Sequence, residues 1–215
     1  MKVIFLPTGG KFYQTPGGLF PSVTTVLQAT MEPAKREALA RWRIREGNKA
    51  DQIRARAAQR GILLHQLLDA QSKGQSLECP EELTSFWSAA APLLKAVGKS
   101  QASEVVIYHP SLGYAGTVDR IAQWRSQLAV IDFKTTARPK PVRLYDEAKL
   151  QVAAYSLAYE SSGVKVPIGL VAVISSQSFQ IIELDETEMR NCQNRWLERL
   201  ERYQHLPLIQ QLLFR

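Results

Sequence analysis

Apolar positions along this chain follow two different periods, and the change between them falls near residue 100. Before it, apolar residues recur at the spacing of one buried helix face. After it they alternate and are rich in Val and Ile, as on a strand with one buried face. The elements predicted in chain order are helices near 34–46, 50–72 and 81–97, strands near 103–108, 114–124 and 128–134, a helix near 145–162, strands near 168–174 and 178–184, and a helix near 185–204.

The beginning of the chain is predicted to be β-structure. Segments Lys2–Leu6 and Lys11–Gln14 flank Pro7–Gly10, which suggests a small hairpin, and a loop is expected at 16–18. Taken with the later elements, this order predicts an α/β fold in which a mixed central β-sheet is flanked by helices, with an N-terminal helical region.

The length of the chain limits the number of domains. At 215 residues it can bury the core of one domain, with at most a small helical appendage. We therefore expect a single domain over 1–215. Residues 1–100 would form its mainly helical, basic N-terminal part, and residues 101–215 its catalytic α/β core.

Composition narrows the class of protein. With 45% hydrophobic and 22% charged residues, the chain is typical of a globular protein rather than a disordered one. No apolar run approaches the roughly 20 residues of a membrane span, so no membrane partner is expected. Residues 1–13 lack the order of charged, apolar and small residues found in signal peptides. The expected location is the cytoplasm of a bacterial or phage-infected cell.

The cysteine count excludes two kinds of metal site, and the net charge favours a polyanionic partner. Cys79 and Cys192 are too few to hold an iron–sulfur cluster or a Cys-only zinc site. The net charge of +7 and the pI near 9.5 favour attraction to phosphate, which by itself is non-specific.

Much of this positive charge lies in one segment, Lys35–Arg60, where nine Lys or Arg accompany three acids. A charge run of this kind can be no more than a solvated helix surface. The alternative is that it contacts nucleic-acid phosphates, in which case Arg41, Arg45 and Lys49 are the residues expected to do so. Both interpretations remain open from the sequence.

The acidic residues converge on one face of the predicted sheet. Because side chains alternate along a strand, Asp132 and Lys134 share one face and Phe133 takes the other. A hairpin tip at Ser126–Gln127 places Asp119 opposite Lys134 and diagonal to Asp132. A four-residue loop at 110–113 places Glu104 opposite Asp119.

Three carboxylates and one lysine in such a cluster favour metal chemistry. Clustered carboxylates repel one another, so a cation or a proton must lie among them. Oxygen ligands suit Mg²⁺ or Mn²⁺, and such ions support phosphodiester hydrolysis. A neighbouring ammonium can orient the attacking water or stabilise the charged transition state.

Three sequence blocks resemble a known family in their order and spacing. They are Gly116-Thr117-Val118-Asp119, Ile131-Asp132-Phe133-Lys134-Thr135-Thr136, and Gln151-Val152-Ala153-Ala154-Tyr155. Together they resemble the RecB-like branch of the PD-(D/E)XK nuclease superfamily. A further block, Gly61-Ile62-Leu63-Leu64-His65, resembles the N-terminal helix of this family, whose histidine adds a nitrogen ligand to the metal. Another, Pro21-Ser22-Val23-Thr24-Thr25, resembles the opening of the mitochondrial genome maintenance exonucleases and their phage and bacterial relatives.

This resemblance implies a restriction-endonuclease-like core and a role for each matching residue. It implies metal binding by His65, Asp119, Asp132 and the Phe133 carbonyl, catalysis by Lys134 and Asp132 with Asp119, and assistance from Glu104. Substrate contacts would come from Gln151, Tyr155, Thr135, Ser22 and Thr24, together with the basic residues named above.

Each of these residues also has a plainer interpretation. Taken alone, His65 is a helix histidine with a satisfied hydrogen bond, Gln151 is a surface residue and Tyr155 a packed one. Ser22 and Thr24 are good N-cap types, although a cap can itself present amides to a phosphate.

The function implied is a Mg²⁺- or Mn²⁺-dependent DNA exonuclease, acting on single strands in repair, recombination or replication. Two alternatives stay open. One is a structure-specific or restriction-like endonuclease. The other is a catalytically inactive nucleic-acid-binding module.

Overall fold

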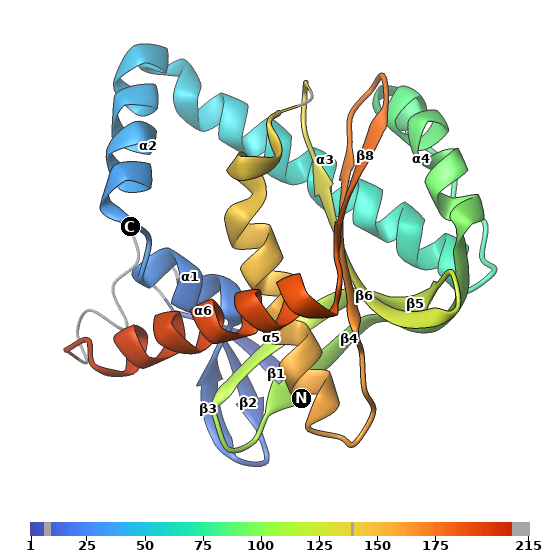
Figure 1. Ribbon diagram of the computed structural model, residues 1–215. Coiled ribbons are helices and arrows are strands. Elements are labelled where there is room, and N and C mark those ends of the chain that lie inside the picture. The colour runs from blue at the N-terminus through green and yellow to red at the C-terminus, as the bar shows by residue number, and fades with distance from the viewer. Residues whose placement is uncertain (7–9, 139, 208–215) are drawn as a thin grey trace.

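A five-stranded mixed sheet forms the centre of the molecule (Figure 1). The structure is a computed structural model that describes residues 1–6, 10–138 and 140–207. The strands of this central sheet are β4 (Val97–His109), β5 (Tyr114–Trp124), β6 (Gln127–Thr135), β7 (Ile168–Ile174) and β8 (Phe179–Leu184), hydrogen-bonded in that order. Only β6 and β7 run parallel. The predicted α/β class with a mixed sheet is confirmed.

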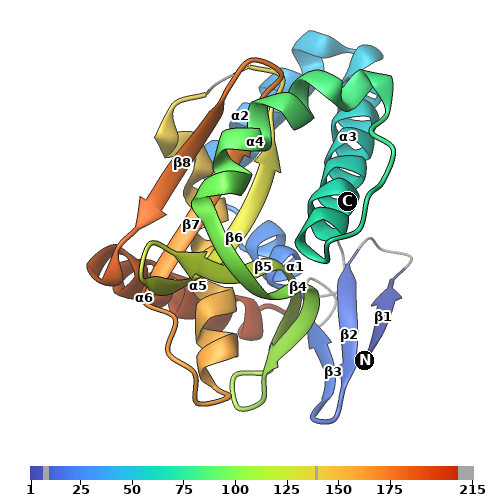
Figure 2. The same cartoon turned by 90° about the vertical axis from the view of Figure 1, so that its right-hand side faces the viewer.

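Helices cover both faces of this sheet. One core lies between the sheet and α1 (Val23–Ala29), α5 (Asp146–Glu160) and α6 (Glu186–Gln204). The other lies under the C-terminal half of α3 (Lys49–Ser72) and under α4 (Thr84–Ala96). Figure 2 looks onto the second face, with α4 in front of the strands. Along β6, Val130 packs in the first core and Ile131 and Phe133 in the second, so the predicted alternation holds.

The N-terminal segment forms a second, three-stranded sheet. Its strands are β1 (Lys2–Phe5), β2 (Lys11–Thr15) and β3 (Gly18–Pro21), paired antiparallel in chain order. The expected pairing of the first two is confirmed, while most of the turn expected at Pro7–Gly10 lies outside the described residues. The sequence prediction missed β3. It identified Ser22 and Thr24 as N-cap types but gave no helix range for α1, which Ser22 caps.

Helix α2 (Pro33–Glu46) and the first half of α3 project from this body (Figure 1). No residue of α2 is buried, and α3 is buried mainly from Leu64 onward. Gly47 ends α2 with a φ of 54°, a left-handed conformation that glycine adopts without strain. We call residues 33–60 the arch. It contains the whole basic segment Lys35–Arg60 identified in the sequence.

The remaining predicted elements are found within a few residues of their expected positions. Two short 3₁₀ turns, η1 (Glu81–Leu83) and η2 (Val142–Tyr145), precede α4 and α5. Strand β4 begins earlier than expected, at Val97. Among the helices described, none is long and apolar enough to cross a membrane.

One of the two predicted strand registers is wrong. The four-residue loop is confirmed, because His109 pairs with Tyr114. The next hairpin turns at Arg125–Ser126 rather than at Ser126–Gln127, since Trp124 pairs with Gln127. Arg125 has a φ of 53°, as the first residue of a tight hairpin turn requires. Arginine is not a residue type that predicts such a turn, so no signal in the sequence indicated it. The shift moves each partner by two positions, so side-chain faces are kept and only the pairs change.

Candidate metal centre

The site lies where β5 and β6 separate, a point that we call the fork. Their pairing ends at Arg120 and Ile131, and in that register the next residues in line are Asp119 and Asp132, not Asp119 and Lys134 as expected. The amide of Phe133 then has no strand partner on this side, and it donates to Asp119 Oδ2 at 2.7 Å. A carboxylate thus takes the place of a backbone acceptor at the fork, as a buried amide requires.

Three ligand atoms meet beside this fork. His65 on α3 places its Nδ1 atom 3.4 Å from Glu104 Oε1 and 3.4 Å from Asp119 Oδ1. The other ring nitrogen, Nε2, lies 3.0 Å from the Phe133 carbonyl oxygen, and this contact fixes the orientation of the ring. Glu104 has a φ of 50°, so it departs from regular strand geometry at the position where its carboxylate meets His65.

The donor set fits a divalent cation. The ligand atoms of His65, Glu104 and Asp119 all lie within 4.8 Å of one another. A cation bound to oxygen ligands at about 2.0–2.6 Å places opposite ligands about 4–5 Å apart. The side chain of Asp119 is 11% exposed, so its charge needs a partner. These three residues could therefore hold a divalent cation.

Asp132 and Lys134 form the second half of the site, on the opposite side of the fork from α3. Asp132 is 1% exposed, and Lys134 Nζ donates to its carboxylate at 2.9 Å. Lys134 Nζ also donates to Gln151 Oε1 at 3.0 Å, and Gln151 Nε2 donates to the Tyr155 hydroxyl at 3.0 Å. The spacing of four residues puts Gln151 and Tyr155 on one face of α5, as expected. Asp132 is not in the group of three that surrounds His65 Nδ1.

Gly116 explains why the motif carries a glycine in front of Asp119. A Cβ atom added there would overlap Tyr155 Cε1 and lie 3.1 Å from both Cζ and the hydroxyl. The backbone of β5 therefore packs directly against the ring. This contact sets the position of Tyr155, and through Gln151 it sets the position of the Lys134 ammonium.

The charges of the site shift several pKa values. Burial lowers the pKa of His65, but Asp119 and Glu104 outweigh it and raise the value to about 10. Burial raises the pKa of Asp132 to about 6, against the opposing effect of Lys134. Burial lowers the pKa of Lys134, and the nearby carboxylates of Asp132 and Asp119 reverse this to a net increase. A protonated His65 and a charged Lys134 compensate the acids where no cation is bound.

The pocket that opens onto this centre contains an acid that the sequence interpretation missed. His65 and Glu104 line a pocket of about 410 Å³ with Gly61, Ile62, Gln66 and Asp69. Asp69 lies one helical turn after His65, and its Oδ2 accepts from Lys73 Nζ at 2.7 Å. The spacing of four residues from a candidate ligand was the signal that could have identified it.

Arg120 was also missed. The residue is 3% exposed, and its guanidinium donates to the Leu68 carbonyl and lies over the ring of Phe133, 5.4 Å from the centroid. It thereby ties α3, which carries His65, to the strand that carries Asp132. An arginine directly after Asp119 in an otherwise apolar strand was the available signal.

The other residues proposed for substrate contact are spread over the molecule. Ser22 is the N-cap of α1, where its hydroxyl accepts from the Thr25 amide at 3.0 Å, and it is buried. Thr24 is exposed next to it, with its hydroxyl 3.0 Å from that of Ser22. Thr135 Oγ1 lies near Gly61 of α3. Arg41, Arg45 and Lys49 are exposed on the arch.

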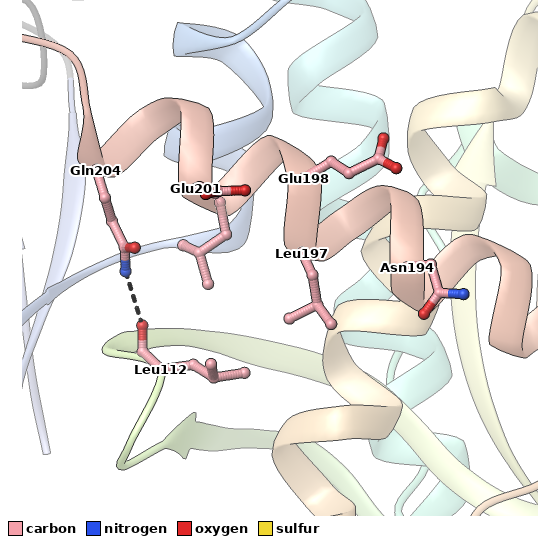
Figure 3. A pocket seen from close by; sticks show the side chains of 7 residues that line it. Leu112, Asn194, Leu197, Glu198, Glu201 and Gln204 are labelled. Atoms are coloured by element: carbon pink, nitrogen blue, oxygen red, sulfur yellow. Dashed lines mark hydrogen bonds between the residues drawn. The ribbon is translucent and has the colours of Figure 1, made fainter.

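A second hollow lies on α6, away from these carboxylates. Figure 3 shows its lining, in which Leu112 from the β4–β5 loop meets side chains of α6. The α6 residues are Asn194, Leu197, Glu198, Leu200, Glu201 and Gln204. With two acids and no lysine or arginine in its lining, it does not suit a phosphate backbone.

Comparison with known proteins agrees with this geometry. A family model described as the PD-(D/E)XK nuclease superfamily matches residues 102–210, which include every strand of the fork. Mitochondrial genome maintenance exonuclease 1 of Xenopus tropicalis is 32% identical over 86% of this chain and 58% of its own length. The mouse protein of that name is 31% identical over 85% of this chain and 58% of its own length.

The chain therefore spans less than two thirds of the curated relatives it matches. Among solved structures, SSO0001 aligns over 87% of this chain and 77% of its own length, with 19% identity and a TM-score of 0.46.

Proposed function

Because this chain belongs to the PD-(D/E)XK nuclease superfamily, we propose that it is a divalent-cation-dependent DNA exonuclease that degrades single strands. The observation that carries the proposal is the convergence of His65, Glu104 and Asp119 on one point, with the Lys134 ammonium across the fork. A basic arch beside the site supplies the charge that a phosphate backbone needs.

Each residue of the site has a proposed role in phosphodiester hydrolysis. A bound Mg²⁺ or Mn²⁺ ion would polarise the phosphate and lower the pKa of a water ligand. His65, Glu104 and Asp119 would hold that ion, with Asp132 and the Phe133 carbonyl as further ligands. Lys134 has a raised pKa and stays charged, so it can orient the attacking water and offset the negative charge that develops on phosphate.

Similarity supports the proposed preference for ends, and the arch supports the proposed preference for single strands. The curated relatives are named exonucleases, at 32% and 31% identity. Arg41, Arg45 and Lys49 lie on helices that stand clear of the body, where they can follow a flexible strand rather than a rigid duplex. Gln151 and Tyr155 would position the catalytic lysine, and Ser22, Thr24 and Thr135 would contact the substrate.

The test is digestion of end-labelled DNA by wild type and by Lys134→Ala and Asp132→Asn. Linear single-stranded, linear double-stranded and circular single-stranded DNA are each incubated with Mg²⁺, with Mn²⁺ and with chelator. We expect mononucleotides or short products from linear single strands only, loss of cleavage with chelator, and loss in both variants with DNA binding retained. Lys165→Ala, which breaks an exposed ion pair with Glu186 far from the site, is the matched control.

Either of two results would show that the proposed function is wrong and would identify another function. Cleavage of circular single strands would identify an endonuclease. Binding without cleavage under every metal condition would identify a nucleic-acid-binding module.

A further inference from the structure

The geometry points to Arg120 as a positioning residue of the metal centre, which holds the proposed ligands in the arrangement that a divalent cation needs. The ligands concerned are His65, Asp119 and the Phe133 carbonyl. Arg120 is 3% exposed, so it acts through these neighbours and not on the substrate. This inference rests on the proposed function, since it assigns the residue that keeps the ligands of that site in place.

Arg120 lies at the centre of the row of residues directly before the acids. It pairs with Ser103 on β4 and with Ile131 on β6. The next residue of each of these three strands in the direction of the site is an acid, namely Glu104, Asp119 and Asp132. A contact that fixes Arg120 therefore acts one residue away from all three acids.

The guanidinium reaches across to α3, the helix that carries His65 and packs against β4, β5 and β6 (Figure 2). Its Nη2 atom donates to the Leu68 carbonyl, three residues after His65, and its Nη1 atom lies 3.5 Å from Gln71 Oε1. The side chains that α3 buries in the core are apolar, and apolar packing has no preferred direction. A charged donor on a carbonyl has one, so Arg120 fixes where α3 lies along its own axis.

The ring of Phe133 connects Arg120 to His65. The guanidinium lies over this ring in a cation–π contact, 5.4 Å from the centroid, and the imidazole meets the same ring edge-on with 6.3 Å between centroids. The backbone of Phe133 faces the site, since its carbonyl contacts His65 Nε2 and its amide donates to Asp119 Oδ2. Arg120 thus restrains a residue whose backbone meets two of the proposed ligands.

The stability of the fold does not account for an arginine at this position. The Nε atom of Arg120 is buried and has no hydrogen-bond partner among the residues that the structure describes. A buried charge costs free energy, and an apolar residue of similar volume is often neutral or stabilising in its place. Its removal leaves no buried carbonyl unpaired, because the Leu68 carbonyl also accepts within α3. We therefore expect Arg120→Met to fold, with a melting temperature close to that of wild type or above it.

The experiment measures Mn²⁺ binding without DNA, by calorimetric titration of wild type, Arg120→Met and Arg120→Lys, with the melting temperature of each protein. Arg199→Met is the matched control. Arg199 is also a buried arginine, 5% exposed, but it donates to the Leu27 carbonyl and the Thr30 hydroxyl. It therefore fastens the end of α1 rather than α3.

We expect Arg120→Met to raise the dissociation constant for Mn²⁺ about tenfold to a hundredfold, as is typical when a partner that orients metal ligands is lost. Arg120→Lys should recover part of this affinity, because its ammonium can bond to α3 but cannot also lie flat on the Phe133 ring. Arg199→Met should lower the melting temperature, since the Leu27 carbonyl at the end of α1 loses its donor, and leave the Mn²⁺ affinity unchanged.

A purely electrostatic role of Arg120 predicts the opposite sign. A positive charge beside the site repels Mn²⁺, so its removal in Arg120→Met would then make Mn²⁺ bind more tightly. Tighter binding or an unchanged dissociation constant in Arg120→Met would overturn the inference. If Arg120→Met does not fold, Arg120→Lys decides, and an affinity equal to that of wild type overturns the inference.

A second readout needs neither DNA nor metal. The chain has three histidines, so its imidazole magnetic resonance spectrum is simple, and the His65 signals are assigned by their loss in His65→Ala. We expect these signals to move or broaden in Arg120→Met, because the contact of Nε2 with the Phe133 carbonyl loosens, while those of His109 and His205 stay in place. If wild type binds no Mn²⁺, the proposed cation dependence is wrong and this readout alone decides. Unchanged His65 signals in Arg120→Met then overturn the inference.

Discussion

Replacing Gly116 by alanine tests whether the fit of β5 against α5 controls the position of Lys134, the lysine that we propose to be catalytic. The added Cβ atom would overlap Cε1 of Tyr155, whose ring is rigid and 4% exposed, so the neighbour cannot simply turn away. Overpacking of this kind destabilises a protein by about 1–3 kcal/mol. For a chain of this length, each kcal/mol lowers the melting temperature by about 2–4 °C, which gives a decrease of about 2–12 °C.

The displacement should also reduce activity. Tyr155 accepts from Gln151 at 3.0 Å, and Gln151 accepts from Lys134 at 3.0 Å. A shift of the ring is therefore passed to the ammonium group. Misplacement of a catalytic group by about 1 Å can reduce the rate about a hundredfold. We expect kcat on single-stranded DNA to fall by about tenfold to a hundredfold, with KM little changed, because the role proposed for Lys134 is in the transition state.

The assay compares four proteins, wild type, two single variants and one double variant, by thermal unfolding and by steady-state cleavage. Gly61→Ala is the matched control for thermal unfolding, since the nearest atom to its new Cβ, Thr135 Oγ1, lies at an ordinary 3.8 Å. It is not a control for cleavage, because Gly61 lines the pocket beside His65. In the middle of α3 that change should raise stability by about 0.5–1 kcal/mol. Adding Tyr155→Leu to Gly116→Ala should restore stability by relieving the overlap, yet leave activity low. A Gly116→Ala protein with the melting temperature and kcat of wild type would refute the reasoning.

Three further predictions concern the metal, the arch and the helix pair behind the site. His65→Ala should raise the metal concentration needed for half-maximal activity, with partial recovery in Mn²⁺; an unshifted titration and a lower melting point would make this histidine structural. Replacing Arg41, Arg45 and Lys49 together with glutamine should flatten the log–log salt dependence of single-strand binding by about 0.7 for each phosphate that is no longer neutralised, whereas an unchanged slope would leave the segment a solubility feature. The pKa of Asp146 is lowered, mainly by a hydrogen bond from Arg195 on α6. The contribution of Asp146 to the stability of the fold is therefore present above the pKa of the unfolded state and is lost as pH falls. Asp146→Asn should therefore melt lower than wild type at pH 7, and the gap should close below about pH 4 if this ion pair is the cause.

Local features of the sequence were enough to identify the class of fold and most of the chemistry. The alternation around Asp132 and Lys134 is a property of the strand itself, so their shared face could be predicted without any partner. The loop between His109 and Tyr114 carries its own turn residues, which is why the register of β4 against β5 followed. The proposal of a metal site needed only the identity of the acids.

The register of β5 against β6 was decided by the folded structure. Neither Arg125 nor Ser126 is a residue type that predicts a tight turn. The register of the two strands is instead the one in which their side chains fill the cores on both faces of the sheet. The error was of two positions rather than one, because the predicted alternation was correct and an odd shift would have moved the side chains of each core to the opposite face of the sheet. Asp119 consequently lies in line with Asp132, and its carboxylate takes the free amide of Phe133.

The sequence by itself determined which residues could carry the chemistry, and the tertiary structure decided which of them meet. His65 reaches the Phe133 carbonyl across 68 positions, and Lys35 reaches Glu147 across 112. Hydrophobic periodicity describes how one element meets the core, and it has no information about which polar side chain of another element lies opposite. That pairing depends on how α3 and α5 pack on the two faces of one sheet, which is fixed only when the whole core is assembled.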